Sequence, residues 1–207
     1  TMSRGLGDVY KRQGLASSPA VWDRFAPELA KVRRVHRLHI AGFDGALPGA
    51  NAIDPILPNI AAELGSYIRR EKLEKPALVG HSMGGVLALQ AAIQHDQLIA
   101  GAMIIDALPF FSVLINPMIT RIEAAMQADA AKAALLAQTP TEFEEGQRTA
   151  IERLALSAVD RARALDWALQ ADRDVMARAM HEVMTTDLRL AIAQIRTPLA
   201  VLFAHDG

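Results

Sequence analysis

A glycine-bracketed serine lies where a short apolar stretch gives way to a long one. The segment Gly80–Gly85 reads GHSMGG, follows the apolar run at the end of Pro76–Val79, and precedes the helix-favouring Val86–Ile93. Strand, sharp turn and helix in this order give the pattern G-x-S-x-G a definite structural setting. The rest of the fold must therefore present Ser82 at the tip of a strand-to-helix turn.

Each residue of this turn has a physical role. Ser82 is expected in a strained backbone conformation, with its Oγ pointing away from the sheet. Gly80 and Gly84 have no Cβ, so neighbouring backbone can pass close to them, and Gly85 lets the next helix lie tightly on the sheet. The helix N-terminus offers N–H groups and partial positive charge to an oxyanion. A solvent-facing serine in a glycine-rich turn is the alternative interpretation.

Composition excludes several classes of function. The 207 residues are 51% hydrophobic and 22% charged, with a net charge of −1, which suits one compact α/β domain. This balance gives no electrostatic case for binding nucleic acid or an anionic membrane. The absence of cysteine excludes disulfides, thiolate metal sites and a cysteine nucleophile. We predict no metal and no cofactor, because neither a metal-ligand cluster nor a phosphate-binding glycine loop occurs in the sequence. No apolar run has the length of a membrane span and no leader is recognisable, so we expect a cytoplasmic protein.

The apolar periodicity predicts strands that alternate with helices. Strands are expected at residues 35–40, 77–80, 99–105 and 199–203, and helices near residues 21–32, 54–73 and 83–95. Between residues 106 and 195 alanine, methionine and charged residues recur at helical spacing, which predicts helices near residues 118–138, 140–156, 160–171 and 172–184. The alternation predicts an α/β fold, with a mostly parallel sheet, helices on both faces and a helical insertion.

The domain organisation follows from these segments. Residues 14–110 and 191–207 are expected to form the α/β core, and residues 111–190 a helical lid insertion. Residues 1–13 show no periodic apolar pattern and are expected to form a tail. Within this tail Asp8–Gln13 reads DVYKRQ, which resembles one translated frame of a transposon-type sequencing adapter. We interpret the tail as an assembly artefact, with a disordered natural tail as the alternative.

Four features carry a resemblance to the α/β-hydrolase family. They are the GHSMGG turn, the Gly14-Leu15 loop with Trp22 downstream, the helical insertion, and a final strand followed by an acidic residue. The resemblance covers about residues 14–206. It implies an eight-stranded sheet, a lid over the active site, and a catalytic serine, acid and histidine in that chain order.

The resemblance also implies roles for individual residues. Ser82 would be the nucleophile, within the elbow formed by Gly80, His81, Gly84 and Gly85. The backbone N–H groups of Met83 and Leu15 would form the oxyanion hole. Gln13 stands where relatives often have histidine, which is a departure from the family pattern.

The identity of the catalytic acid stays open at this point. Asp206 follows the last predicted strand, the usual family position, whereas Asp106 follows the preceding strand, an alternative position. Chain order places the catalytic histidine after the acid, yet only Gly207 follows Asp206. We therefore expect that the chain ends before that histidine, and that the parent enzyme is active while these 207 residues are close to inactive.

None of the six histidines fits the role of base. His81 belongs to the elbow and is expected to point away from Ser82. His36 and His39 are expected on opposite faces of one strand, which also argues against a shared metal. The other three are interpreted as a helix-end residue, an insertion residue and a neighbour of the acid: His95, His181 and His205.

The expected function is hydrolysis of a carboxylic ester, thioester or lactone through an acyl-enzyme, on a small-molecule acyl substrate. Methionines of the insertion suggest an adaptable apolar acyl pocket, or else ordinary helix packing: Met118, Met126, Met176, Met180 and Met184. Other chemistries of the same fold remain alternatives, namely carbon–carbon bond hydrolysis, acyl transfer and cofactor-free peroxidase-like activity. A binding module that has lost catalysis is a further alternative.

Overall fold

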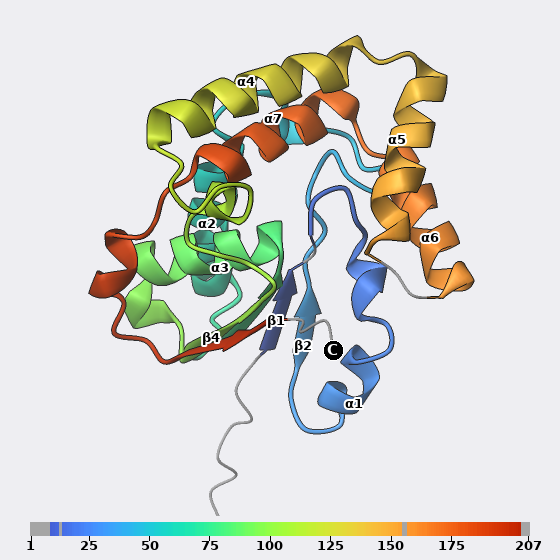
Figure 1. The fold of residues 1–207 in the computed structure, drawn as a ribbon. Coiled ribbons are helices and arrows are strands. Elements are labelled where there is room, and N and C mark those ends of the chain that lie inside the picture. The colour runs from blue at the N-terminus through green and yellow to red at the C-terminus, as the bar shows by residue number, and fades with distance from the viewer. Residues whose placement is uncertain (1–8, 13, 155–156, 204–207) are drawn as a thin grey trace, which may run out of the picture.

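Parallel strands form the centre of the molecule (Figure 1). The structure, a computed structural model, describes residues 9–12, 14–154 and 157–203. Within these residues one five-stranded sheet has the order β2-β1-β3-β4-β5, and every neighbouring pair is parallel. The strands are β1 (Val9–Arg12), β2 (Val35–Arg37), β3 (Ala77–His81), β4 (Gly101–Ile105) and β5 (Leu199–Leu202). The predicted α/β fold with a parallel sheet is confirmed.

Strand β1 corrects the expected domain boundary. Val9–Arg12 lies in the segment expected to be a tail, yet its backbone pairs with β2 on one side and β3 on the other. The two neighbouring strands provide the hydrogen-bond partners, so strand formation here does not depend on a local apolar period. The sheet therefore begins at residue 9, while residues 1–8 and Gln13 lie outside the described residues.

The helices before the insertion cover both faces of the sheet. Figure 1 shows α2 and α3 on one side of β1 and β2 and α1 on the other. Their bounds, with those of the short 3-10 helices among them, are η1 Pro19–Trp22, α1 Ala26–Ala30, η2 Gly49–Ala52, α2 Ile56–Arg70, α3 Met83–Gln94 and η3 Asp96–Leu98. Buried residues fall on every side of α3, which places this helix at the centre of the core.

The expected helix at residues 21–32 is wrong in detail. The segment forms η1 and the five-residue α1 instead, and its buried side chains are Trp22 and Ala26. Val21, Phe25 and Val32 have the apolar spacing of a helix face, but all three side chains are exposed. Helical spacing alone did not identify which face the sheet would cover.

Between β4 and β5 the chain leaves the sheet, and its described residues form four α-helices. After η4 (Phe111–Leu114) come α4 (Arg121–Ala137), α5 (Pro140–Glu152), α6 (Ala158–Leu169) and α7 (Arg173–Thr185), and η5 (Ala191–Gln194) leads back to β5. In Figure 1 α4 and α7 run side by side above the sheet, and α5 and α6 stand at one end.

Side-chain caps explain where these four helices begin. Thr120 and Thr139 form capping boxes with Glu123 and Glu142, in which the hydroxyl and the carboxylate each accept a backbone N–H. Ser157 caps α6 and Asp172 caps α7 in the simpler way, with one side-chain oxygen.

Candidate active site

Ser82 occupies the junction between β3 and α3. Its φ of 52° and ψ of −123° lie outside the regions that non-glycine residues favour, so the turn holds this residue under strain. Its N–H donates to the carbonyl oxygen of Ile105 at 2.9 Å, and its own carbonyl accepts the N–H of Gly85 at 2.8 Å. The strained residue is thus fixed by the neighbouring strand on one side and by the helix on the other.

Close contacts, with backbone at Gly80 and with a side chain at Gly85, require the glycines at these two positions of the elbow. A Cβ on Gly80 would overlap the carbonyl oxygen of Gly84, and one on Gly85 would lie 2.5 Å from the Cβ of Ala107. Both approaches are closer than van der Waals contact, so α3 could not lie this close to β3 and β4 if Gly80 or Gly85 carried a side chain. The turn owes its sharpness to these positions.

The Gly14 loop lies directly against the elbow. A Cβ on Gly14 would lie 3.3 Å from His81 Nδ1 and 3.4 Å from Ser82 Cβ. Leu15 follows, and Ala16 takes a positive φ of 50° that turns the chain toward η1. The loop that was expected to supply one oxyanion donor therefore lies against Ser82.

Met83 is the first residue of α3, so its N–H has no acceptor within the helix. The N-terminus of α3 also carries the partial positive charge of the helix dipole. Met83 and Leu15, the two expected oxyanion donors, thus belong to the two segments that meet at Ser82.

Asp106 begins the segment that leaves β4 beside the elbow. Ile105 is paired with His81 in the strand register and its carbonyl oxygen accepts the N–H of Ser82. Asp106 is therefore the residue that directly follows this contact. Its φ is 46°, and its N–H donates to the carbonyl oxygen of Leu202 at 2.9 Å. Asp206 lies outside the described residues.

His81 is paired with Ile105, the residue before Asp106, in the register of β3 and β4. Burial lowers the pKa of the His81 imidazole, and the negative charge of Asp106 offsets part of that shift. The His81 ring lies against Gly14. Its burial therefore favours the neutral imidazole within the elbow.

Four further histidines are occupied elsewhere. His36 Nδ1 pairs with the Tyr67 hydroxyl at 2.9 Å, and His39 Nε2 pairs with the Phe43 carbonyl at 2.8 Å. His39 lies beyond the end of β2, which stops at Arg37, so the two are not residues of one strand as expected. His95 packs against Gly65 of α2, and His181 of α7 pairs with Asp129 of α4.

Within the described residues, Ser82 Oγ thus has no hydrogen-bond partner. His205 lies outside the described residues. In the same described part of the chain, no three histidine, aspartate or glutamate side chains are grouped as metal ligands would be. Nor does a helix in this part have the length and apolar character to cross a membrane.

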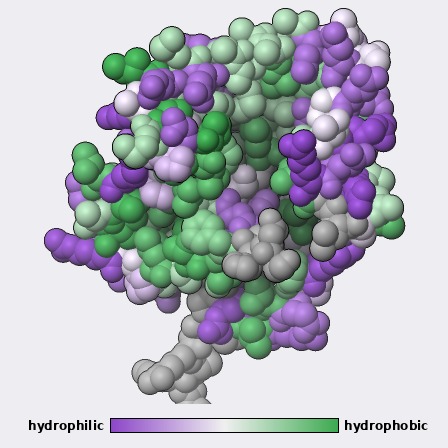
Figure 2. Space-filling model, in the orientation of Figure 1, coloured by the Kyte–Doolittle hydropathy of each residue, from purple (hydrophilic) through white to green (hydrophobic). Residues whose placement is uncertain are grey.

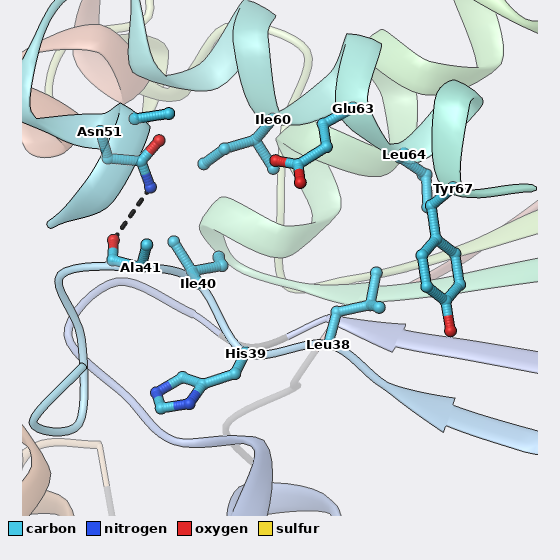
Figure 3. Close-up of a pocket in the computed structure, with 10 residues that line it drawn as sticks. Leu38, His39, Ile40, Ala41, Asn51, Ile60, Glu63, Leu64 and Tyr67 are labelled. Carbon is cyan, nitrogen blue, oxygen red and sulfur yellow. Dashed lines mark hydrogen bonds between the residues drawn. The ribbon is translucent and has the colours of Figure 1, made fainter. Parts of the chain in front are cut away.

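A cavity of about 250 Å³ lies away from the elbow, between the segment after β2 and helix α2 (Figure 3). Leu38, His39 and Ile40 form one wall, and Leu64 and Tyr67 of α2 form part of the other. Figure 3 also shows the Asn51 amide donating to the Ala41 carbonyl at its edge, at 2.9 Å. None of the expected catalytic residues lines this cavity.

The methionines of the insertion divide into two groups. Met118, in the turn before α4, and Met126 of α4 are 84% and 67% exposed, whereas Met176 and Met184 of α7 are buried. Met180 is partly buried against the core. Neither Met118 nor Met126 lines the 250 Å³ cavity, and the buried methionines pack in the core. The structure therefore gives the acyl-pocket interpretation no support.

Residues 13–203 match the sequence profile of a family described as the alpha/beta hydrolase fold. The match spans almost the whole described chain and includes the elbow, the Gly14 loop and the insertion. The chain belongs to the α/β-hydrolase family.

Solved structures of other proteins show the same fold for this α/β hydrolase. MenH from S. aureus aligns with a TM-score of 0.78 at 17% identity, over 96% of this chain and 75% of that one. A hydrolase from Pseudomonas aeruginosa aligns at 0.75 and 21% identity, over 97% and 72%. The enol-lactonase from Burkholderia xenovorans aligns at 0.71 and 17% identity, over 97% and 74%. Identities this low establish the fold alone.

Two curated relatives resemble part of the hydrolase in sequence. The pimeloyl-[acyl-carrier protein] methyl ester esterase of Aeromonas hydrophila is 31% identical over 104 residues, which are 50% of this chain and 39% of that protein. The esterase of the same name from Edwardsiella ictaluri is 27% identical over 112 residues, 54% of this chain and 41% of that protein. The match thus spans about two fifths of each relative's length.

Two anchor residues of the hydrolase were missed in the sequence. Glu182 of α7 accepts the N–H groups of Ile56 and Leu57, and Arg178 is almost fully buried while it bonds the loop before α2. The sequence carries a signal for both, because Arg178 and Glu182 are charged residues four positions apart on the apolar side of α7. Spacing alone did not show that this side faces the core.

Proposed function

We propose that the site at Ser82 is that of a serine hydrolase, which cleaves a carboxylic ester, thioester or lactone through an acyl-enzyme. The observation that carries the proposal is the strained backbone of Ser82, at the N-terminus of α3 and in contact with the Gly14 loop. Strain of this kind persists where the surrounding structure enforces it, and such positions cluster at active sites. A serine that serves only as a turn residue has no need of this conformation.

The proposed reaction uses the groups that meet at the elbow. Ser82 Oγ attacks the substrate carbonyl carbon and gives up its proton to a general base, and the carbonyl oxygen becomes an oxyanion. The N–H groups of Met83 and Leu15 stabilise that oxyanion, each by about 3 kcal/mol. Collapse of the intermediate releases the alcohol or thiol, which takes a proton, and water then hydrolyses the acyl-enzyme. An acid orients the base in this scheme, with Asp106 and Asp206 as the two candidates.

The names of the relatives support the ester class. Two are methyl ester esterases, and one structural neighbour is an enol-lactonase, whose name denotes a cyclic ester. In each case the bond named joins an acyl group to an ester oxygen. A small acyl substrate is consistent with this, because the chemistry needs only that bond at Ser82.

A binding module is the second candidate, and one observation favours it. Within the described residues no histidine reaches Ser82 Oγ, and a serine without a base is a weak nucleophile. Other chemistries of the fold also remain, namely carbon–carbon hydrolysis, acyl transfer and peroxidase-like activity. These alternatives predict different outcomes in the same assay.

The test is hydrolysis of 4-nitrophenyl butyrate by the product of the native gene, so that its outcome does not depend on the ends of these 207 residues. We expect Ser82→Ala to remove about 10⁴-fold or more of kcat/KM. Asp106→Asn separates the two acids: a loss of about 10⁴-fold assigns the role to Asp106, and a change below tenfold assigns it to Asp206. Equal activity in the wild type and Ser82→Ala would contradict the proposal.

A further inference from the structure

The cavity beside α2 is separate from the site at Ser82. It has a volume of about 250 Å³ and lies between α2 and residues 38–41, which follow β2 in the chain (Figure 3). Neither Gly14 nor Ser82, Met83 or Asp106 lines it. Pockets for drug-sized ligands have volumes of roughly 300–1,000 Å³, so this cavity suits a smaller molecule.

Apolar side chains form the two facing walls of the cavity. Leu38 and Ile40 alternate with His39 along an extended segment, so the two apolar side chains point toward α2 while the His39 ring points away from it, as Figure 3 shows. Ile60 and Leu64, one turn apart on α2, form the opposite wall. Ile40, Ile60 and Leu64 are all buried in the core. The walls are therefore firmly packed, and they favour a ligand with an aliphatic body.

Hydrogen bonds hold both ends of the cavity in place. At one end the Asn51 amide donates to the Ala41 carbonyl at 2.9 Å, and the Asn51 carbonyl accepts from the buried Arg178 at 2.7 Å. At the other end the Tyr67 hydroxyl lies 2.9 Å from His36 Nδ1. A cavity held in this way exists before a ligand enters it, so binding has little order to create.

Glu63 gives the cavity its charge. Among the described residues that line the cavity, it is the only aspartate, glutamate, lysine or arginine. Figure 3 shows its carboxylate turned toward the space between α2 and residues 38–41. Glu63 is exposed, so a ligand that arrives from water can reach the carboxylate.

The carboxylate of Glu63 has neither an ion pair nor a hydrogen bond within the described part of the chain. The residues one turn away on α2 carry no charge: Asn59, Ile60, Ser66 and Tyr67. The basic residues of this helix, Arg69 and Arg70, come in its last turn and contact Ser66 and Glu71 instead. The chain therefore leaves this charge for a cation from outside.

Carboxylates on α5 and α6 lie in different surroundings. Figure 2 shows hydrophilic residues gathered over these helices, where Glu144 pairs with Arg148 at 2.8 Å and Asp160 pairs with Arg24 at 3.0 Å. Glu63 instead has an apolar cavity beside it. A carboxylate next to apolar walls matches a ligand that carries one positive charge on an aliphatic body.

We propose that this cavity is a binding site for a small aliphatic ammonium ion. The ammonium group pairs with the Glu63 carboxylate through charge-assisted hydrogen bonds, and the carbon chain lies between the walls formed by Leu38, Ile40 and Leu64. The site needs neither Ser82 nor a general base, so the proposal is independent of the proposed function. A free amine and a lysine side chain of another chain both carry this chemistry.

The test is an NMR titration of the ¹⁵N-labelled 207-residue chain with n-butylammonium chloride at constant ionic strength. The titration runs to about 50 mM, above the Kd of about 1–10 mM that we expect for so small a ligand. Amide signals of residues 38–41 and 60–67 should shift. Two matched ligands, n-butanol without charge and n-butyrate with the opposite charge, should bind at least about threefold more weakly.

The variant Glu63→Gln keeps the shape of the side chain and removes its charge. It should weaken the binding of n-butylammonium about three- to tenfold, to a Kd close to that of n-butanol. Glu74→Gln is the matched control, because Glu74 is an exposed glutamate outside the cavity and the net charge changes equally. Its Kd should stay within about twofold of the wild-type value.

A further ligand, Nα-acetyl-lysine methylamide, separates the two sources of the ammonium group. Tighter binding than that of n-butylammonium assigns the site to a lysine side chain of another chain, and equal or weaker binding assigns it to a free amine. Three results would overturn the proposal. They are the absence of shifts at residues 38–41 and 60–67, equal affinity for n-butanol and n-butylammonium, and equal affinity of folded Glu63→Gln and wild type.

Discussion

The backbone N–H of Ser82 donates to the carbonyl oxygen of Ile105 across 2.9 Å, one residue before Asp106. This bond ties the strained turn to β4, so the position of Ser82 depends on the neighbouring strand as well as on its own. The same bond sets the start of the Asp106 segment beside the elbow. Ser82 and Asp106 both take a positive φ, of 52° and 46°, at the carboxyl edge of the sheet.

Gly80→Ala should destabilise the protein strongly. The new methyl group would overlap the Gly84 carbonyl, which belongs to rigid backbone and cannot move aside. We expect a loss of about 3 kcal/mol in the free energy of unfolding, measured by urea denaturation. Gly146→Ala is the matched control, since at that exposed position in α5 the added Cβ would meet only Gln138 Nε2, at an ordinary contact distance of 3.8 Å, and the helix should gain about 0.5–1 kcal/mol. A Gly80→Ala protein of unchanged stability would show that the elbow is not this tight.

The effect of Gly65→Ala on the free energy of unfolding should have one sign with His95 present and the opposite sign when position 95 is alanine. In the wild type the added methyl group would collide with the His95 ring, so we expect destabilisation. In a His95→Ala background the space is free, and the helix interior of α2 should gain about 0.5–1 kcal/mol from alanine. A double-mutant cycle in urea measures the coupling. Additive effects would contradict the contact.

Stability should fall as the pH drops below about 6.5. Burial, with Arg69 nearby, lowers the pKa of His95 from its ordinary 6.5. Between the lowered pKa of His95 in the folded protein and its ordinary pKa in the unfolded chain, the unfolded chain binds more protons. The contribution of neutral His95 to the free energy of unfolding is therefore complete above the unfolded pKa and is lost as the pH falls through the lowered one. Urea unfolding between pH 7.5 and 5.0 measures the slope. His95→Phe should flatten it in part, and an unchanged slope would exclude His95 as a cause.

Glu182→Gln should weaken the anchor between α7 and α2. The carboxylate accepts two backbone N–H groups at the N-terminus of α2, and an amide can accept only one of them. We expect a loss of about 1–3 kcal/mol in unfolding free energy. Glu144→Gln is the control, because its exposed pair with Arg148 is worth less than about 0.5 kcal/mol. Equal effects at the two positions would show that the anchor is not stabilising.

Local sequence signals sufficed for the elbow and for most elements. The strand–turn–helix at Ser82, the parallel strands and the four helices of the insertion all follow from periodicity and turn chemistry, and the structure confirms the fold. The caps at Thr120 and Thr139 agree with the helix starts. These features are encoded within a few neighbouring residues, which is why the sequence alone could indicate them.

Features that depend on distant partners were not predictable in the same way. Strand β1 at Val9–Arg12 exists through pairing with β2 and β3, which no local pattern records. The exposure of Phe25 and Val32, and the buried contact of His95 with Gly65, are also set by other elements. Of the two candidate acids, Asp106 is placed next to the elbow, while Asp206 lies outside the described residues and its role stays a prediction.

The measurement that tests the nucleophile most directly is covalent labelling. The product of the native gene is incubated with a fluorophosphonate and analysed by intact mass and peptide mass spectrometry. We predict one adduct per chain, located on Ser82, and none in Ser82→Ala with its fold retained. An adduct at another residue, or none on a folded wild-type protein, would contradict the assignment of Ser82 as the nucleophile.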